Sequence, residues 1–155
     1  MRPTPVSNPN VLLVDDNRDG LLARRCVLEE LGYRVQVAST AEEGLKLYET
    51  TAFDVVVTDY RMPRMNGAEL IQRIRKLNPT ARIILLSGYI EPLGLTEQST
   101  GADAVIAKSC NEPAHLVRWI RRLVNRAAAR KPPATQKSEA RQAHANALKS
   151  GTLGS

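Results

Sequence analysis

The sequence predicts an α/β protein built on an open, doubly wound, five-stranded parallel sheet, with the element order (βα)5. Short apolar runs rich in β-branched residues alternate along the chain with segments of helical periodicity. The runs VLLV, VVVT and IILL are almost entirely apolar, which is typical of strands buried on both faces of a parallel sheet. Alternating strands and helices with right-handed crossovers form such a sheet.

The five predicted strands are Val11–Val14, Arg34–Ala38, Val55–Thr58, Ile83–Leu86 and Ala104–Ala107. The second is more polar than its neighbours, so we expect it at an edge of the sheet. In open α/β sheets, ligands bind beyond the carboxyl ends of the strands, at the point where the strand order switches. The residues that follow these strands are therefore the first candidates for a functional site.

The first three helices carry clear signals. The first is predicted over Asn17–Leu31 and is closed by Gly32. The stretch TAEE, from Thr40 to Glu43, predicts a capping box that opens the second helix. The third is predicted over Ala68–Leu77 as an amphipathic helix. Its apolar face holds Leu70, Ile71, Ile74 and Leu77.

The sequence signal is weak for the fourth predicted helix and strong for the last. Pro92 and Gly94 interrupt any long helix in their segment, so we expect a fourth helix of about two turns, from near Leu93 to Thr100. The last helix is predicted from Glu112 to Arg130. Its buried stripe is predicted to be Leu116, Val117, Ile120, Leu123 and Val124.

Length and composition indicate one ordinary globular domain, with 155 residues, 43% hydrophobic and 25% charged. No apolar run approaches the roughly 20 residues of a membrane helix. The start, MRPTPVSNPN, lacks the apolar segment of a signal peptide. We therefore expect a cytoplasmic protein without a membrane partner. Cys26 and Cys110 have no CxxC spacing, so we expect both as small apolar residues in or near the core.

The positive charge is concentrated near the C-terminus. The chain carries a net charge of +6, and residues 126–155 hold six Lys or Arg and one acid, a balance of +5. We therefore predict an N-terminal extension over residues 1–9, a folded domain over 10–130 and a basic, flexible tail over 131–155. The tail lacks aromatic residues to stack on bases. Tail-driven nucleic-acid binding would thus be nonspecific and salt-sensitive, without sequence specificity.

Polar residues follow four of the five predicted strands. Asp15 and Asp16 end the first strand, Asp59 the third, Ser87 the fourth and Lys108 the fifth. Three carboxylates at one sheet edge would repel one another and raise one another's pKa. A hard divalent cation, which prefers oxygen ligands, would relieve this repulsion.

This set of residues suits phosphoryl transfer. A carboxylate can attack phosphorus and become an acyl phosphate, while a metal ion, a lysine and a hydroxyl neutralise the phosphoryl oxygens. Asp59 is the better candidate for the nucleophile because it stands alone on a central strand. Asp15 and Asp16 stand together and suit a metal.

Four motifs in this order resemble the receiver domain of two-component response regulators, the CheY-like fold. They are VDDN, TDYRMPRMNG, Ser87 with Gly88, and GADAVIAK ending in Lys108. Each motif alone is weak, but the set is specific and the resemblance runs from about Asn10 to Asn125. It implies a flavodoxin-like strand order of 2-1-3-4-5.

The resemblance also implies a metal site for Mg²⁺ or Mn²⁺. Asp16 and Asp59 would ligate the ion, with the backbone carbonyl of Arg61 as the third protein ligand. Asp15 would act mainly through water. The loop under this site would be shaped by Met62, Pro63 and Gly67.

The remaining implied roles concern the phosphoryl group. Asp59 would accept it from a sensor histidine kinase or a histidine phosphotransfer protein, Ser87 would bond one of its oxygens and Lys108 would pair with it. The chain would then be a stand-alone regulatory receiver, not an enzyme, apart from its own phosphorylation and dephosphorylation. It would act on a downstream protein target or in a phosphorelay, with homodimerisation left open.

Two positions depart from the family pattern. Ser109 stands where the family usually has a proline after the lysine, often with a cis bond. Val105 stands where an aromatic residue often swings inward on activation. Both departures favour an alternative, a pseudo-receiver that signals without phosphate.

Another alternative is a haloacid-dehalogenase-type phosphatase, which also uses Asp, Ser or Thr, Lys and Mg²⁺. That class places D-x-D-x-T/V after the first strand. This chain has DDNRD there, so the motif fails.

Overall fold

The structure is a computed structural model and describes residues 8–88, 94–109 and 111–130. Its centre is a five-stranded parallel sheet in the order β2-β1-β3-β4-β5. The elements are β1 (Asn10–Val14), α1 (Arg18–Glu30), β2 (Arg34–Ala38), α2 (Ala41–Thr50), β3 (Val55–Asp59), α3 (Gly67–Leu77), β4 (Ile83–Ser87), α5 (Glu97–Thr100), β5 (Ala104–Ala107) and α6 (Glu112–Arg130). The predicted fold class, the strand order and the position of β2 at an edge are confirmed.

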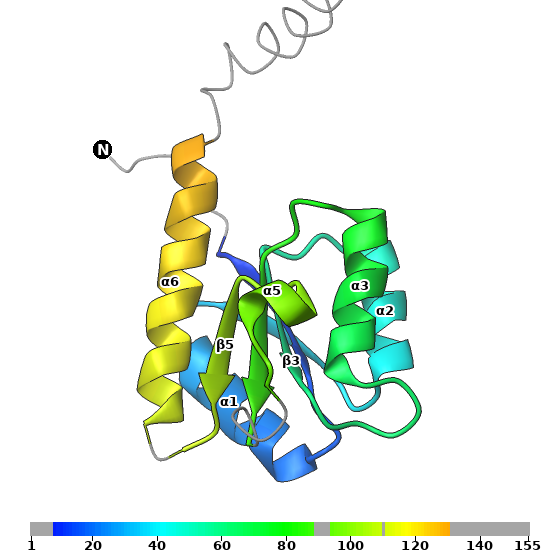
Figure 1. The fold of residues 1–155 in the computed structure, drawn as a ribbon. Helices are drawn as coiled ribbons and strands as arrows, with labels where there is room; N and C mark the ends of the chain where they lie inside the picture. Colours follow the sequence, from blue (N-terminus) through cyan, green and yellow to red (C-terminus); the bar gives the residue numbers. More distant parts are fainter. Residues whose placement is uncertain (1–7, 89–93, 110, 131–155) are drawn as a thin grey trace, which may run out of the picture. The chain divides into compact units, whose positions relative to one another are not determined.

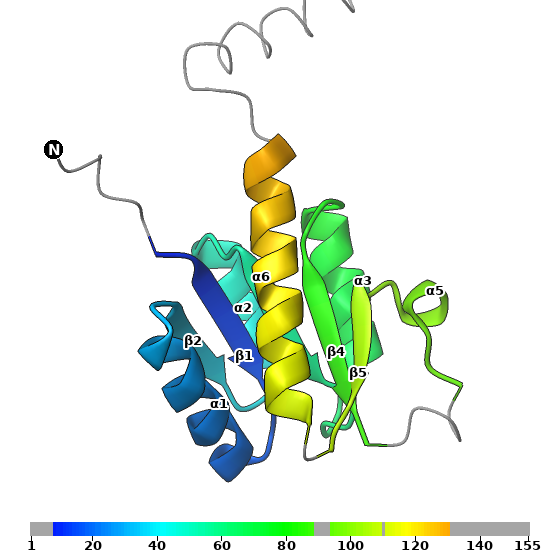
Figure 2. The same ribbon diagram turned by 90° about the vertical axis from the view of Figure 1, so that its left-hand side faces the viewer.

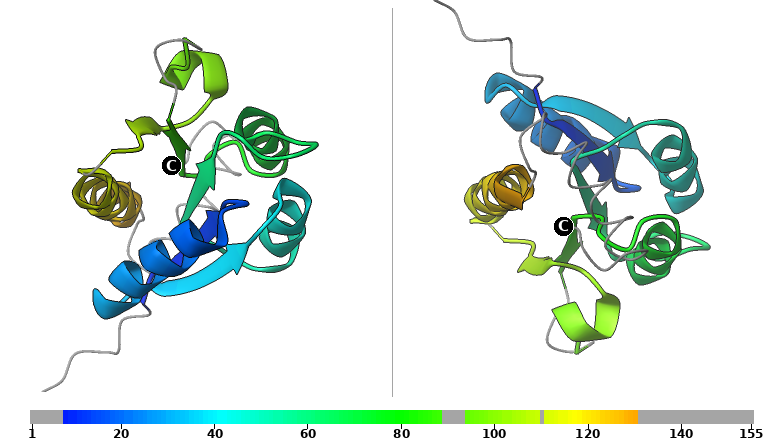
Figure 3. Two further views of the ribbon diagram at one scale, coloured as in Figure 1. Left: turned by 90° about the horizontal axis from the view of Figure 1, so that it is seen from below. Right: turned by 90° about the horizontal axis from the view of Figure 1, so that it is seen from above.

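Helices cover both faces of the sheet (Figure 1). Helix α1 and the part of α6 up to Leu123 lie on one face, and α2 and α3 lie on the other, as Figures 2 and 3 show. Successive strand side chains point to opposite faces, so each apolar run supplies both cores. On the α2 and α3 side, the buried cluster includes Leu12, Val14, Val56, Ile83 and Leu85 with Leu70, Ile71 and Ile74 of α3.

Local sequence signals account for the helix boundaries. The Asn17 side chain caps α1 by accepting a hydrogen bond from the Gly20 N–H, and Gly32 follows the helix with φ +96°. Asn66 and Glu69 form a complete capping box at the start of α3. The box predicted for α2 forms only in half. Thr40 accepts from the Glu43 N–H, whereas the Glu43 carboxylate accepts from Ser39 instead of the cap residue.

Three predictions of position were wrong. Leu77 is 51% exposed, because it is the last residue of α3 and no layer covers it. The fourth predicted helix is a single turn, α5, that begins at its cap residue Thr96; Leu93 lies outside the described residues. Cys26 is exposed because it lies about 140° round the helix from the buried Leu21 at 100° per residue. The other cysteine lies outside the described residues.

The last helix starts where predicted, and Leu116, Ile120 and Leu123 are buried. Val117 and Val124 are only half-buried. The chain divides into two compact units, Met1–Leu123 and Val124–Ser155, and the sheet lies in the first. The predicted extension (apart from its last two residues) and the predicted tail lie outside the described residues. Within the described ranges, no helix has the length and apolar character that a membrane crossing requires.

Candidate functional site

The carboxyl ends of four parallel strands lie along the same side of the sheet, called here the carboxyl edge, and bring the predicted polar residues together there. Asp15 follows β1, while Asp59 and Ser87 are the last residues of β3 and β4. Lys108 follows β5, and its backbone N–H donates to the Ser87 carbonyl at 3.0 Å. Residues far apart in the sequence therefore meet because parallel strands present their carboxyl ends on the same side.

The three predicted acids form one cluster at this edge. Each of Asp15, Asp16 and Asp59 has a carboxylate oxygen, and these three atoms lie within 4.8 Å of one another. Asp15 is 2% exposed and Asp59 is 6% exposed, whereas Asp16 is open to solvent. Two of the three carboxylates are thus removed from water beside each other, an arrangement that needs compensating positive charge.

Lys108 supplies part of that charge. Its Nζ lies 2.9 Å from Asp59 Oδ1 and 3.5 Å from Asp15 Oδ2. The pKa of Asp59 is nevertheless raised from its ordinary value. Burial is the main cause and the charge of Asp15 adds to it, while the hydrogen bond from Lys108 acts in the opposite direction. The Asp59 carboxylate is therefore less stable in the folded protein than an exposed aspartate would be.

A small cavity of about 130 Å³ opens beside Asp59. It is lined by Asp59, Tyr60, Arg61, Ser87, Gly88 and Lys108. Asp59, Ser87 and Lys108 thus line one space at the strand ends. An acceptor oxygen, a hydroxyl and a cation around one cavity are the groups that phosphoryl transfer uses.

The donors at this edge fit a hard divalent cation. All three clustered side chains are carboxylates, and oxygen ligands of this kind suit Mg²⁺. Arg61, whose carbonyl is the predicted additional ligand, lines the same cavity. Asp16 is the exposed member of the cluster, so an ion can reach it from solvent.

The loop from Asp59 to Gly67 explains why the TDYRMPRMNG motif has its composition. The Gly67 N–H donates to the Tyr60 carbonyl at 2.8 Å and closes the loop. A Cβ atom on Gly67 would lie 2.3 Å from the Asp59 carbonyl oxygen. Met62 is buried beneath the loop, and Arg64 has a left-handed φ of 70°. Glycine at position 67 therefore allows α3 to start directly against the backbone of the candidate nucleophile.

Two residues at the site were missed by the sequence reasoning. Arg24 of α1 lies 2.9 Å from Asp15 Oδ2, and it also pairs with both carboxylate oxygens of Glu112, the first residue of α6. A signal for Arg24 existed. It follows Leu21 by three residues and precedes Leu28 by four, which places a charged side chain on the apolar stripe of the first helix.

The two departures from the family pattern have local structural roles. No cis peptide bond occurs within the described ranges, so the bond between Lys108 and Ser109 is trans. Ser109 instead starts the turn into α6, because its carbonyl accepts from the Glu112 N–H and its Oγ accepts from the Asn111 N–H. Val105 is half-buried, and its backbone N–H donates to Glu97 Oε2 at 3.2 Å.

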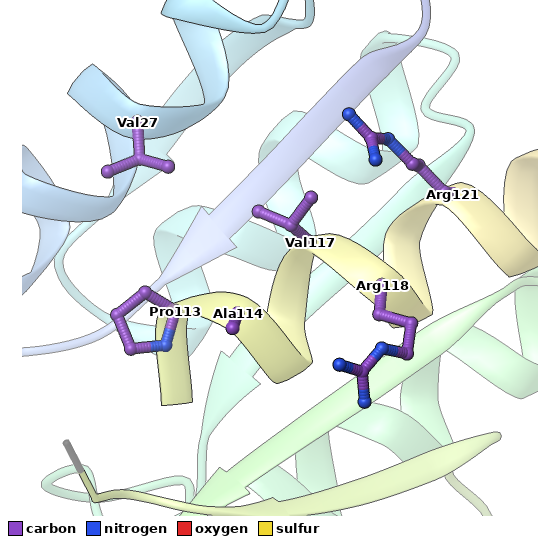
Figure 4. A pocket seen from close by; sticks show the side chains of 6 residues that line it. All are labelled: Val27, Pro113, Ala114, Val117, Arg118 and Arg121. Carbon is purple, nitrogen blue, oxygen red and sulfur yellow. The ribbon is translucent and has the colours of Figure 1, made fainter. Parts of the chain in front are cut away.

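A separate groove of about 470 Å³ lies between α1 and α6 (Figure 4). Its lining residues are Val27 of α1 and Pro113, Ala114, Val117, Arg118 and Arg121 of α6. Arg118 and Arg121 are exposed. The groove contains none of the acids of the cluster.

The comparison with protein families agrees with this geometry. A model described as the response regulator receiver domain matches residues 11–121. The chain belongs to this family. The receiver is regulatory, phosphorylation on aspartate is standard for its members, and receivers are typically phosphorylated by sensor histidine kinases.

Individual relatives show the same family over part of the chain. A response regulator receiver protein of Anaeromyxobacter sp. is 38% identical over 79 residues, which cover 51% of this chain and 33% of that protein. The virulence sensor protein BvgS of Bordetella bronchiseptica is 46% identical over 71 residues, covering 46% of this chain and 6% of the sensor. This receiver therefore spans a third or less of the length of these two curated relatives.

Solved receiver structures have the same fold. A CheY-like receiver from Methanospirillum hungatei superposes with a TM-score of 0.71 at 34% identity, covering 77% of this chain and 96% of that one. The response regulator TrrA of Thermotoga maritima, solved in complex with Mg(2+)-BeF, gives a TM-score of 0.68 at 31% identity. The match covers 74% of this chain and 98% of that one. The chain is thus a receiver domain with an acidic pocket formed by Asp15, Asp16 and Asp59.

Proposed function

We propose that this receiver accepts a phosphoryl group on Asp59 from a phosphohistidine donor, in a reaction that depends on Mg²⁺ or Mn²⁺. The observation that carries the proposal is the grouping of Asp59, Ser87 and Lys108 around one cavity at the sheet edge. Asp59 is the only one of the three clustered acids that lines this cavity.

The proposed transfer is a substitution at phosphorus. A carboxylate oxygen of Asp59 forms the new phosphorus–oxygen bond while the phosphorus–nitrogen bond of the donor breaks. The donor histidine nitrogen keeps the electron pair of that bond. The product is an aspartyl phosphate. In a separate step, water attacks its phosphorus, the bond from phosphorus to the Asp59 oxygen breaks, and inorganic phosphate and the free carboxylate are released.

Three residues would hold the divalent cation. Asp16 and Asp59 would contribute carboxylate oxygens, and Arg61 would contribute its backbone carbonyl. Asp15 would act through water. When bound, the cation supplies positive charge against the phosphoryl oxygens.

Lys108 and Ser87 would act on the phosphoryl group itself. The Lys108 ammonium group already lies 2.9 Å from Asp59 Oδ1. It would therefore pair with an oxygen of the phosphoryl group once that group is bound to the Asp59 carboxylate. Ser87 lines the same cavity, and its hydroxyl would donate a hydrogen bond to a second phosphoryl oxygen. Both groups would stabilise the negative charge that the transfer brings to the site.

The partners follow from this chemistry. The donor would be a sensor histidine kinase or a histidine phosphotransfer protein, and the phosphorylated receiver would bind a downstream protein or pass the group along a relay. The receiver domain would comprise residues 10–130. We expect the chain without residues 131–155 to accept phosphate as well as the full chain does.

Intact mass measured after incubation with acetyl phosphate and Mg²⁺ tests the proposal. The wild-type chain should gain one phosphoryl group, about 80 Da, as expected for acyl-phosphate formation. Asp59→Asn should gain none, and chelation of the metal should abolish the gain in the wild type. Asp19→Asn is the matched control, since it removes an exposed acid in the first turn of α1 and should leave the gain unchanged.

A gain that persists in Asp59→Asn would place the acceptor elsewhere and contradict the assignment. No gain from acetyl phosphate or from phosphorylated histidine domains, in a folded chain that binds Mg²⁺, would instead support the pseudo-receiver. Val105 and Ser109 are the two residues that favour that second function.

A further inference from the structure

Arg24 links the acidic cluster to the last helix through two ion pairs. Its Nη1 donates to Asp15 Oδ2 at 2.9 Å, while its Nε and Nη2 donate to the two oxygens of Glu112 at 2.9 and 3.1 Å. The side chain of Arg24 is 13% exposed, and those of its two partners are more deeply buried. A bidentate guanidinium–carboxylate pair of this kind has a fixed orientation.

A glycine in helix α1 leaves room for the Arg24 side chain. Gly20 lies one turn before Arg24, and a Cβ atom on Gly20 would lie 3.0 Å from Arg24 Nη1 and 3.6 Å from Asp15 Oδ2. A glycine in a helix costs about 1 kcal/mol relative to alanine. Its presence here leaves room for the guanidinium group next to Asp15.

Both carboxylate oxygens of Asp15 already have donors from the protein. Oδ1 accepts from the Asn17 N–H at 2.9 Å, and Oδ2 faces Arg24 at 2.9 Å and Lys108 at 3.5 Å. The negative charge of Asp15 is therefore neutralised by the protein before any ion binds. Asp16 and Asp59 are left as the acids that can give a carboxylate oxygen to a divalent cation.

We propose that Arg24 is a positioning residue that competes with the divalent cation for Asp15 and so lowers the metal affinity of the site. The proposal rests on the proposed function, because it concerns the cation that the phosphoryl transfer needs. Glu112 holds the guanidinium group in place from the opposite side. Arg24 itself remains charged: burial lowers its pKa, but the hydrogen bonds and charges of Glu112 and Asp15 raise it further, and the balance is a raised pKa.

The competing explanation is a purely structural ion pair between α1 and α6. The two explanations predict different results for metal binding. A structural pair would change the melting temperature and leave the affinity of the folded protein for metal unchanged. If the Arg24 guanidinium group instead competes with the metal ion for Asp15, its removal should raise the metal affinity, and removal of the Glu112 charge should lower it.

The test is calorimetric titration of the full, unphosphorylated chain with Mg²⁺ and with Mn²⁺ at constant ionic strength. Arg24→Met should bind either ion about tenfold more tightly, because loss of the positive charge beside Asp15 removes repulsion of the divalent ion, and tenfold corresponds to about 1.4 kcal/mol. Glu112→Gln should bind the ions several-fold more weakly, since Arg24 then loses a neutralising partner. Arg25→Met is the control. It removes an adjacent arginine that pairs with Glu29 on the surface and should change affinity less than twofold.

Arg24→Met leaves Glu112 buried without a partner, which can prevent folding. The double variant Arg24→Met with Glu112→Gln removes both charges and should still bind the ions more tightly than the wild type. Equal or weaker binding by the folded double variant, or by folded Arg24→Met, would overturn the proposal. Failure of the wild type to bind either ion at millimolar concentration would instead count against the metal dependence of the proposed function.

Discussion

Replacing Gly67 by alanine tests how closely the site depends on the backbone beneath Asp59. Gly67 is the first residue of α3, and its N–H closes the loop to Tyr60. An added Cβ would lie 2.3 Å from the Asp59 carbonyl oxygen, 2.9 Å from Leu85 Cδ1 and 3.0 Å from the Tyr60 Cα. Two of these three atoms belong to the backbone, which cannot rotate away as a side chain can.

The expected cost follows from these contacts. Relief of the clash requires the start of α3 to move by about 1 Å from the end of β3, and overpacking of this kind costs about 1–3 kcal/mol. Alanine regains about 0.5–1 kcal/mol relative to glycine in a helix. We expect a net loss of about 1 kcal/mol in the free energy of unfolding and a fall of about 3–5 °C in melting temperature. The rate of phosphorylation by acetyl phosphate should fall as well, because Asp59 is displaced.

Thermal unfolding followed by circular dichroism measures this effect. Gly88→Ala is the matched control, since Gly88 also adjoins the site but a Cβ there would meet nothing within 4 Å and its φ is not left-handed. Its stability should stay within about 0.5 kcal/mol of the wild type. If Gly67→Ala melts at the same temperature as Gly88→Ala, the reasoning about the loop is wrong.

Two further predictions concern charge. The pKa of Asp59 is raised above its ordinary 3.8, mainly by burial, so its favourable contribution to stability is present below that pH and lost as pH rises through the folded-state pKa. Asp59→Asn should therefore melt at a higher temperature than the wild type at pH 7 in chelator. The difference in melting temperature between the two proteins should shrink towards pH 4. A difference that stays constant with pH would contradict the raised pKa of Asp59. Arg75→Met should lose about 2 kcal/mol of stability by chemical denaturation, because the Arg75 guanidinium bonds the Gly101 carbonyl and Asp103. Arg73→Met, which removes an exposed arginine of the same helix, should lose almost none.

The strands and the gathering of acids at the sheet edge were predictable because they depend on local signals and on one rule of topology. A run such as VVVT followed by Asp59 defines both a buried strand and the residue at its carboxyl end. Once the sheet is parallel, the ends of all strands share one side. Neither inference needs knowledge of how any particular side chain packs.

Side-chain partners across the fold were harder to predict. Arg24 and Glu112 are separated by 88 residues, and no local pattern states that one will meet the other. The capping box of α2 failed for a similar reason, because the Glu43 carboxylate had a competing donor at Ser39. Leu77 and Cys26 show that helical periodicity assigns a face but not whether another element covers it.

The hydrogen bond between Glu97 and Val105 has a consequence for β5, the outermost strand on one side of the sheet. Strand β5 ends the sheet, and an edge strand offers unpaired backbone groups to which a strand of another chain can add. The Val105 N–H is occupied by Glu97 Oε2, and the incoming strand would also meet the carboxylate and the α5 turn that carries it. Growth of the sheet beyond β5, into a pair of chains or an aggregate, is thereby opposed by one acidic side chain.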